Sequence, residues 1–176
     1  MIDWSAPRLA ALRAAMHKPS QYRKALGALD ELCYLRAGEA HEHPVFIARC
    51  ASLAAAVDWI VFVLRVAGHD AGLASDASYV LACASFGLLA SKESCQPLLP
   101  AVAPAMAAMK MHRRDAYVTD KVVKFLHTMM CSSDKLREAL RQLGVRRAVR
   151  KAGKLHRGLD SIQESVKNCR RMLAES

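Results

Sequence analysis

Apolar residues recur at spacings of three and four along most of this 176-residue chain, as they do in amphipathic helices. Glycines, prolines and short polar runs separate the periodic segments, and residues of these kinds end helices. We therefore expect an all-α protein without paired strands. The pattern predicts helices over residues 5–18, 21–37, 44–52, 55–67, 76–90, 101–111, 116–131, 134–143, 145–152 and 159–173, with a shorter one restarting at 91 and broken by Pro100.

The second half of the chain repeats itself. Residues 101–109 are matched 43 positions later by residues 144–152, and the same apolar places fall 45 positions earlier over residues 57–64. Each copy is followed by a histidine-containing turn, at His69, His112 and His156, and then by a long periodic segment. A recurrence of about 40–47 residues made only of helices is typical of armadillo and HEAT arrays.

One unit of this recurrence resembles the armadillo repeat. It has a short helix, a second helix opened by Gly144-Val145, a charged turn and a long third helix. The resemblance covers residues 45–176, which divide into repeats over 45–90, 91–131 and 132–176, with residues 1–44 as an N-terminal helical cap. It implies a short right-handed α-solenoid whose third helices line a concave groove that binds proteins. HEAT repeats, with two helices per unit, are the alternative.

Armadillo proteins that carry nuclear import signals place an asparagine near the end of each third helix. The corresponding places here hold Leu88, Thr128 and Arg171. The resemblance therefore does not extend to the binding of import signals.

Charge is distributed unevenly along the chain. Residues 1–100 hold nine Lys/Arg and nine Asp/Glu, whereas residues 101–176 hold 17 Lys/Arg and seven Asp/Glu. The formal net charge of +10 thus belongs to the last 76 residues. Such an asymmetry favours an acidic partner, although a solvated basic face without a ligand has the same composition.

The densest basic segment lies within residues 145–157. One face of its helix holds Val145, Ala148, Val149 and Ala152, and the basic residues share the opposite face. Guanidinium groups pair bidentately with carboxylate or phosphate, so this stripe suits an anionic partner. We expect the partner-binding surface to comprise Arg146, Arg147, Arg150, Lys151, Lys154, Arg157, Arg170, Arg171, Lys121 and Lys124, with Arg113 and Arg114 able to join it.

Catalytic and cofactor motifs are missing from the sequence. It contains no glycine-rich phosphate loop, no Gly-x-Ser-x-Gly and no His-Glu-x-x-His. Six cysteines lack the paired spacing of a zinc site, so we expect free thiols, no metal and no cofactor. His41 and His43 are expected in a solvated turn, and the three repeat histidines at exposed bends.

We therefore expect a non-enzymatic scaffold or adaptor whose basic C-terminal surface docks an acidic protein. The alternative is a structural subunit of a ribonucleoprotein or organellar complex, with the basic end against RNA or an acidic subunit. Only Tyr117 and Phe125 are aromatic after residue 100, which disfavours base stacking. An apolar window over 51–67 is interrupted by Asp58 and Arg65 and predicts a buried helix rather than a transmembrane segment. We expect an intracellular protein, cytoplasmic or, if the N-terminus is a presequence, mitochondrial.

Overall fold

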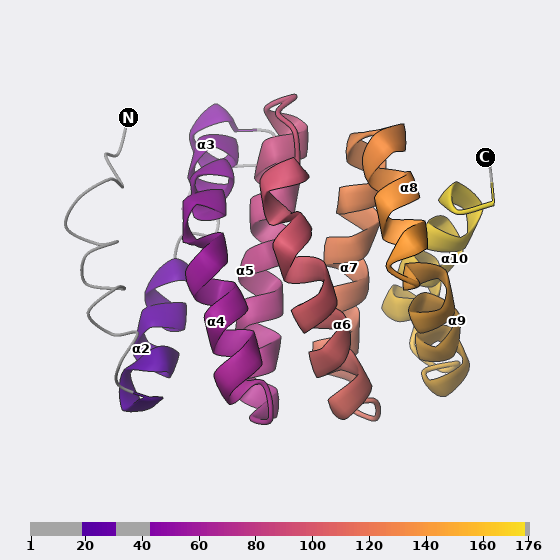
Figure 1. Ribbon diagram of the computed structural model, residues 1–176, viewed down its shortest axis with the longest axis horizontal. Coiled ribbons are helices and arrows are strands. Elements are labelled where there is room, and N and C mark those ends of the chain that lie inside the picture. The colour runs from indigo at the N-terminus through magenta and orange to yellow at the C-terminus, as the bar shows by residue number, and fades with distance from the viewer. Residues whose placement is uncertain (1–18, 31–42, 175–176) are drawn as a thin grey trace.

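The computed structural model describes residues 19–30 and 43–174, and all regular structure within these ranges is helical (Figure 1). This confirms the all-α prediction for the described part of the chain. The helix predicted over 5–18 and the end of the one predicted over 21–37 lie outside these residues. The elements are α2 (Pro19–Asp30), α3 (Pro44–Ser52), η2 (Leu53–Ala56), α4 (Val57–Ala67), α5 (Ala71–Ala90), η3 (Gln96–Ala101), α6 (Val102–Met111), α7 (Ala116–Ser132), α8 (Asp134–Gln142), α9 (Val145–Leu155) and α10 (Asp160–Met172).

The sequence recurrence corresponds to a recurrence of helices. Helices α4, α6 and α9 begin at residues 57, 102 and 145, which are 45 and 43 positions apart. Helices α5, α7 and α10 begin at residues 71, 116 and 160, which are 45 and 44 positions apart. Figure 1 shows the first set in front of the second, so that equivalent helices stand side by side along the molecule. Two layers of helices thus run from α2 at one end to α10 at the other.

The element that precedes each of α4, α6 and α9 is not conserved in type. Helix α3 followed by the 3₁₀ turn η2 precedes α4, and helix α8 precedes α9, whereas α6 is preceded only by the 3₁₀ turn η3, which contains Pro97 and Pro100. Proline lacks the N–H that an α-helix needs and clashes with the carbonyl four residues earlier. The helix predicted to restart at residue 91 is therefore wrong, and a turn followed by η3 takes its place.

Helix α5 begins five residues earlier than predicted, at Ala71 rather than at residue 76. The Asp70 carboxylate accepts a hydrogen bond from the Leu73 N–H at 3.0 Å and so caps the helix. This bond and the nearby Arg23 guanidinium lower the pKa of Asp70. Gly72 and Ser75 are residue types common in turns, but the capping aspartate determines where the helix starts.

Two of the repeat histidines join one unit to the next. The His112 Nε2 donates to the Gly68 carbonyl at 2.7 Å, and the His156 Nε2 donates to the Arg113 carbonyl at 3.1 Å. Each bond spans 43 or 44 residues, one period of the recurrence. The prediction that all three histidines are exposed is wrong, because His156 is only 7% exposed and His112 is half-buried, whereas His69 is exposed.

The core is continuous along the two layers. It includes Trp59 of α4 and Val149 of α9. Helices α3 and α5 meet closely at Gly87, where a Cβ would lie 2.5 Å from the Cys50 carbonyl carbon. The five described cysteines, at positions 50, 83, 95, 131 and 169, are free thiols, and Cys33 lies outside the described residues.

Two helical stretches, Pro44–Ala67 and Ala71–Ala90, are long and apolar enough to cross a membrane by length and composition. Both stretches also supply residues to the protein core, such as Ile60 and Leu81. Packing of the core is therefore a second explanation for their apolar composition. The expectation of a buried helix rather than a transmembrane segment therefore stays a prediction.

Candidate anion-binding surface

Helix α9 presents the basic stripe because its sequence divides sharply between two faces. Gly144 directly precedes this helix and has φ +77°, a left-handed conformation that favours glycine. The chain leaves α8 and enters α9 at this residue, where the sequence predicted that a second helix opens. Val145 and Val149 are fully buried. With this face fixed against the core, the basic residues project outward.

The structure divides the predicted stripe between the two sides of α9. Arg146 and Arg150 face α10, at the end of the molecule, whereas Arg147 and Lys151 face α6. Consecutive basic residues on a helix point about 100° apart, so one helix can supply two surfaces. The quartet predicted as a single site therefore belongs to two.

The α10 side of this helix bears a hollow of about 560 Å³ and a second of about 320 Å³. Both are lined by Arg150, Gln163, Val166 and Arg170, so they form one continuous depression. We call its cations the basic end: Arg146, Arg150, Lys154, Arg157, Lys167, Arg170 and Arg171.

Helix α10 is held against α9 beneath these cations. The Gln163 side-chain amide donates to the carbonyls of Gly153 at 2.9 Å and His156 at 2.8 Å. A Cβ at Gly153 would lie 2.8 Å from Cγ1 of Val166, so the two helices approach closely there. Bonds and close packing of this kind fix the spacing between the arginines of the two helices.

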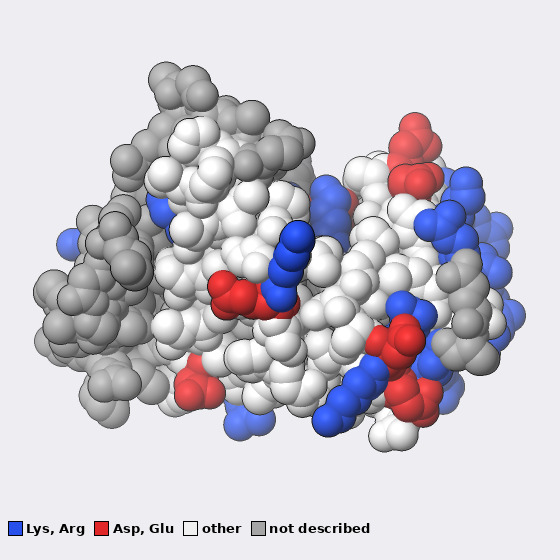
Figure 2. Space-filling view, turned by 90° about the horizontal axis from the view of Figure 1, so that it is seen from above, with Lys and Arg blue, Asp and Glu red and all other residues white. Residues whose placement is uncertain are grey.

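Basic side chains predominate among the described residues of the basic end. None of the described residues that line the two hollows is Asp or Glu. Nearby acids on α8 pair with its own arginines: Asp134 with Arg137 at 3.0 Å and Glu138 with Arg141 at 3.0 Å. Figure 2 shows Lys and Arg gathered over the end of the molecule that α9 and α10 form. Clustered like charges raise the local concentration of anions.

Lys121 and Lys124, predicted as part of the same surface, are not brought to it. The Asp120 carboxylate pairs with Lys124 at 2.8 Å and with Lys121 at 3.6 Å. Lys121 also lies 4.8 Å from the centre of the Tyr79 ring. These contacts hold both lysines on α7, away from the residues that line the hollows.

Sequence reasoning missed Lys167. It precedes Arg170 and Arg171 by three and four positions, which places all three on one helical face. This spacing was a signal that could have found it.

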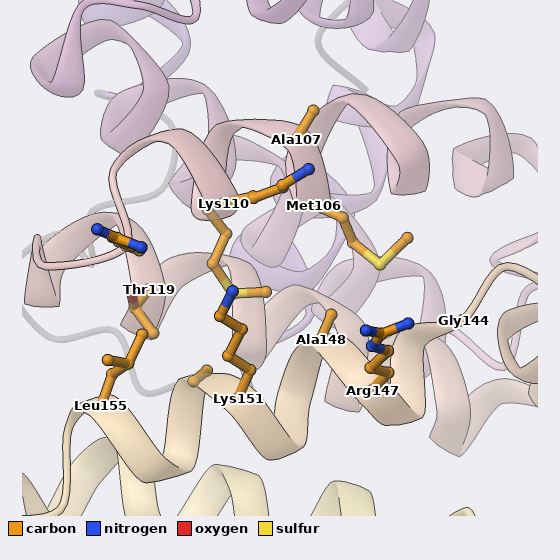
Figure 3. Close-up of a pocket in the computed structure, with 12 residues that line it drawn as sticks. Met106, Ala107, Lys110, Thr119, Gly144, Arg147, Ala148, Lys151 and Leu155 are labelled. Atoms are coloured by element: carbon orange, nitrogen blue, oxygen red, sulfur yellow. The ribbon is translucent and has the colours of Figure 1, made fainter.

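A second depression of about 450 Å³ lies on the other side of α9, between α6 and α9 (Figure 3). Figure 3 shows Arg147 and Lys151 rising from α9 towards α6, which contributes Met106 and Lys110. Lys110 was also missed by sequence reasoning. The repeat register could have found it, because α6 and α9 are equivalent helices of consecutive units.

The described residues contain no group of three or more His, Cys, Asp or Glu side chains placed to hold a metal. His43, expected in a solvated turn, caps α3 by accepting a hydrogen bond from the Val45 N–H at 3.3 Å. His41 lies outside the described residues.

Comparison with known proteins gives no relative: the chain matches no protein-family model, no curated protein and no solved structure.

Proposed function

We propose that this chain is a non-enzymatic scaffold of the armadillo type, and that its basic end docks an acidic segment of a protein partner. The observation that carries the proposal is the set of seven cations around one depression, in which none of the described lining residues is Asp or Glu. Five of the seven are arginines, which bind carboxylates through two parallel hydrogen bonds.

The armadillo assignment is supported by the helix spacing. Equivalent helices recur at 43 to 45 residues in two layers, and histidine bonds link consecutive units. Arrays in which each repeat packs mainly on its neighbours present extended surfaces to partners. We infer a right-handed superhelix of three units over residues 45–176, with the 3₁₀ turn η3 replacing the first helix of the middle unit.

The alternative function is that of a subunit that contacts RNA through the same cations of the basic end. Proteins that bind single strands add aromatic side chains on which bases stack. Here Phe125 is fully buried, and Tyr117, although 76% exposed, lies at the start of α7 and does not line the basic end. Carboxylates of a protein partner therefore suit the surface better than nucleic acid does.

The test is affinity capture from the source lysate with three forms of the protein. One is wild type, and the second carries Arg146→Glu, Arg150→Glu and Arg170→Glu. The third is a control with the same change in net charge at exposed positions elsewhere, Arg65→Glu, Lys92→Glu and Lys135→Glu. Circular dichroism and melting should be alike for all three, because surface substitutions change stability by only about 0.5 kcal/mol.

A protein retained by wild type and control after nuclease treatment, and lost by the basic-end variant, supports the proposal. Its capture should also weaken as salt rises. Capture that disappears with nuclease favours the RNA alternative, for which affinity falls steeply with salt. Equal capture by all three forms contradicts the proposal.

A further inference from the structure

The depression between α6 and α9 differs in character from the basic end, because its floor is apolar. Met106 and Met109 of α6 face Ala148 and Ala152 of α9, and Leu155 closes one end while remaining 48% exposed. The two alanines are too small to fill the space between the helices. Apolar surface of this kind gains free energy when a partner covers it.

The rim of this depression is basic on both sides. Lys110 and Arg113 come from α6 and the turn after it, and Arg147 and Lys151 come from α9. No acid is among the described residues that line it. A ligand that fits must therefore combine an apolar surface with negative charge on both of its flanks.

We propose that the α6–α9 groove binds an amphipathic helix of a protein partner, with acidic residues on both sides of the helix's apolar stripe. Helices that bind in grooves insert apolar side chains at positions i, i+3, i+4 and i+7. Methionine side chains adapt to the shape of such a partner, and the floor of the groove includes the half-buried Met106 beside the buried Met109. The proposal concerns a surface separate from the basic end and does not depend on it.

A fatty acid would match the groove less well. Small-ligand sites bury most of the ligand surface, whereas Ala107, Gly144 and Leu155, which line this groove, are exposed. One carboxylate also needs only one of the two basic rims. A helix uses both rims and leaves its polar face in solvent.

The experiment selects phage-displayed, helix-biased peptides on the wild-type protein. The selected peptides are then measured against three variants by fluorescence anisotropy. Arg147→Glu with Lys151→Glu reverses one rim of the groove. Arg146→Glu with Arg150→Glu makes the same change on the same helix but at the basic end, and serves as the matched control. Ala107→Trp fills the groove from an exposed position without changing charge. Circular dichroism checks that each variant is folded.

The proposal expects selected peptides with an apolar stripe flanked by Asp and Glu. Their affinity should fall about tenfold or more with the reversed rim and with Ala107→Trp, and stay unchanged in the control. Peptides without acids, affinities that neither groove variant lowers, or displacement of the peptides by dodecanoate at the groove would overturn it. Peptides lost only by the control variant would also overturn it, while leaving the function proposed for the basic end intact.

Discussion

At the scale of single residues, Gly87 determines how closely α3 and α5 pack. Its Cα hydrogens face the backbone of Ala51 and Cys50. We predict that Gly87→Ala destabilises the protein by about 1–3 kcal/mol or more, because the rigid backbone of a packed helix has to move. Gly27→Ala in α2 is the control: outside its own helix backbone, no atom of the described residues lies within 4 Å of the added Cβ. This change should therefore be stabilising by up to about 1 kcal/mol. Urea unfolding of both variants measures the difference, and equal stabilities would show that the α3–α5 contact is misplaced.

Cys169 makes stability depend on pH. Burial, followed by the nearby Cys131, raises the pKa of its thiol from 9.0 to about 12. Below pH 9 the thiol is protonated in both folded and unfolded states, and its full contribution to stability is present. Between pH 9 and about 12 only the unfolded state loses the proton, so stability falls by up to about 1.4 kcal/mol per pH unit.

We therefore predict that Cys169→Ala loses stability less steeply than wild type as pH rises above 9. Chemical unfolding at several pH values from 8 to 10.5 measures the two slopes, and taking their difference cancels the other titrating groups. Parallel slopes would mean that the Cys169 thiol is not buried in the folded protein.

At the scale of elements, α9 is the helix on which both candidate surfaces depend. Val149, on the inner face of this helix, is fully buried. We predict that Val149→Asp costs about 3 kcal/mol or more, because it buries a carboxylate without a partner. Arg150→Asp, one residue further and exposed, should change stability by about 0.5 kcal/mol. Thermal melting compares them, and similar melting temperatures would mean that the helix faces are assigned the wrong way round.

Periodicity alone predicted most of the helices because their apolar faces are continuous and their ends carry clear signals. Pro44 opens α3, Ser133 caps α8 through its side chain, and Gly144 separates α8 from α9. The errors fell where signals conflict: Gly72 and Ser75 resemble a turn although Asp70 caps a helix there. The spacing of prolines in η3 likewise overrides the apolar pattern around it.

The candidate surfaces were only partly predictable for a different reason. The same depression is lined by Arg146, Arg150 and Arg170 because α9 packs against α10. Two helices that follow each other in the chain are expected to pack in this way. The groove requires α6 beside α9, a contact between residues more than 30 positions apart. A charge stripe on one helix does not show which neighbouring helix each of its members faces.

At the scale of the whole molecule, the histidine bonds couple neighbouring units. The His156 Nε2, which bonds the Arg113 carbonyl, also lies 3.2 Å from the Thr119 hydroxyl. We predict that His156→Leu leaves these groups without that partner and loosens the last unit. Hydrogen–deuterium exchange should then rise in α9 and α10 more than in α5, because units of a linear array open separately. The control, His69→Leu, changes an exposed residue and should leave exchange unaltered. A uniform rise along the chain would contradict the prediction.

The uneven packing of the two layers has a mechanical consequence. Helices α7 and α10 pack against each other on one side, while α6 and α9 leave the groove open on the other. We therefore expect the contact between α7 and α10 to be the axis about which the last unit would rotate, and such a rotation would change the width of the groove. The same rotation would change the distance between the His156 Nε2 and the Arg113 carbonyl, which is 3.1 Å in this structure. The helix proposed to bind in the groove would then set the angle between the last two units. A ligand bound at the basic end, which α9 and α10 alone form, would leave that angle unchanged.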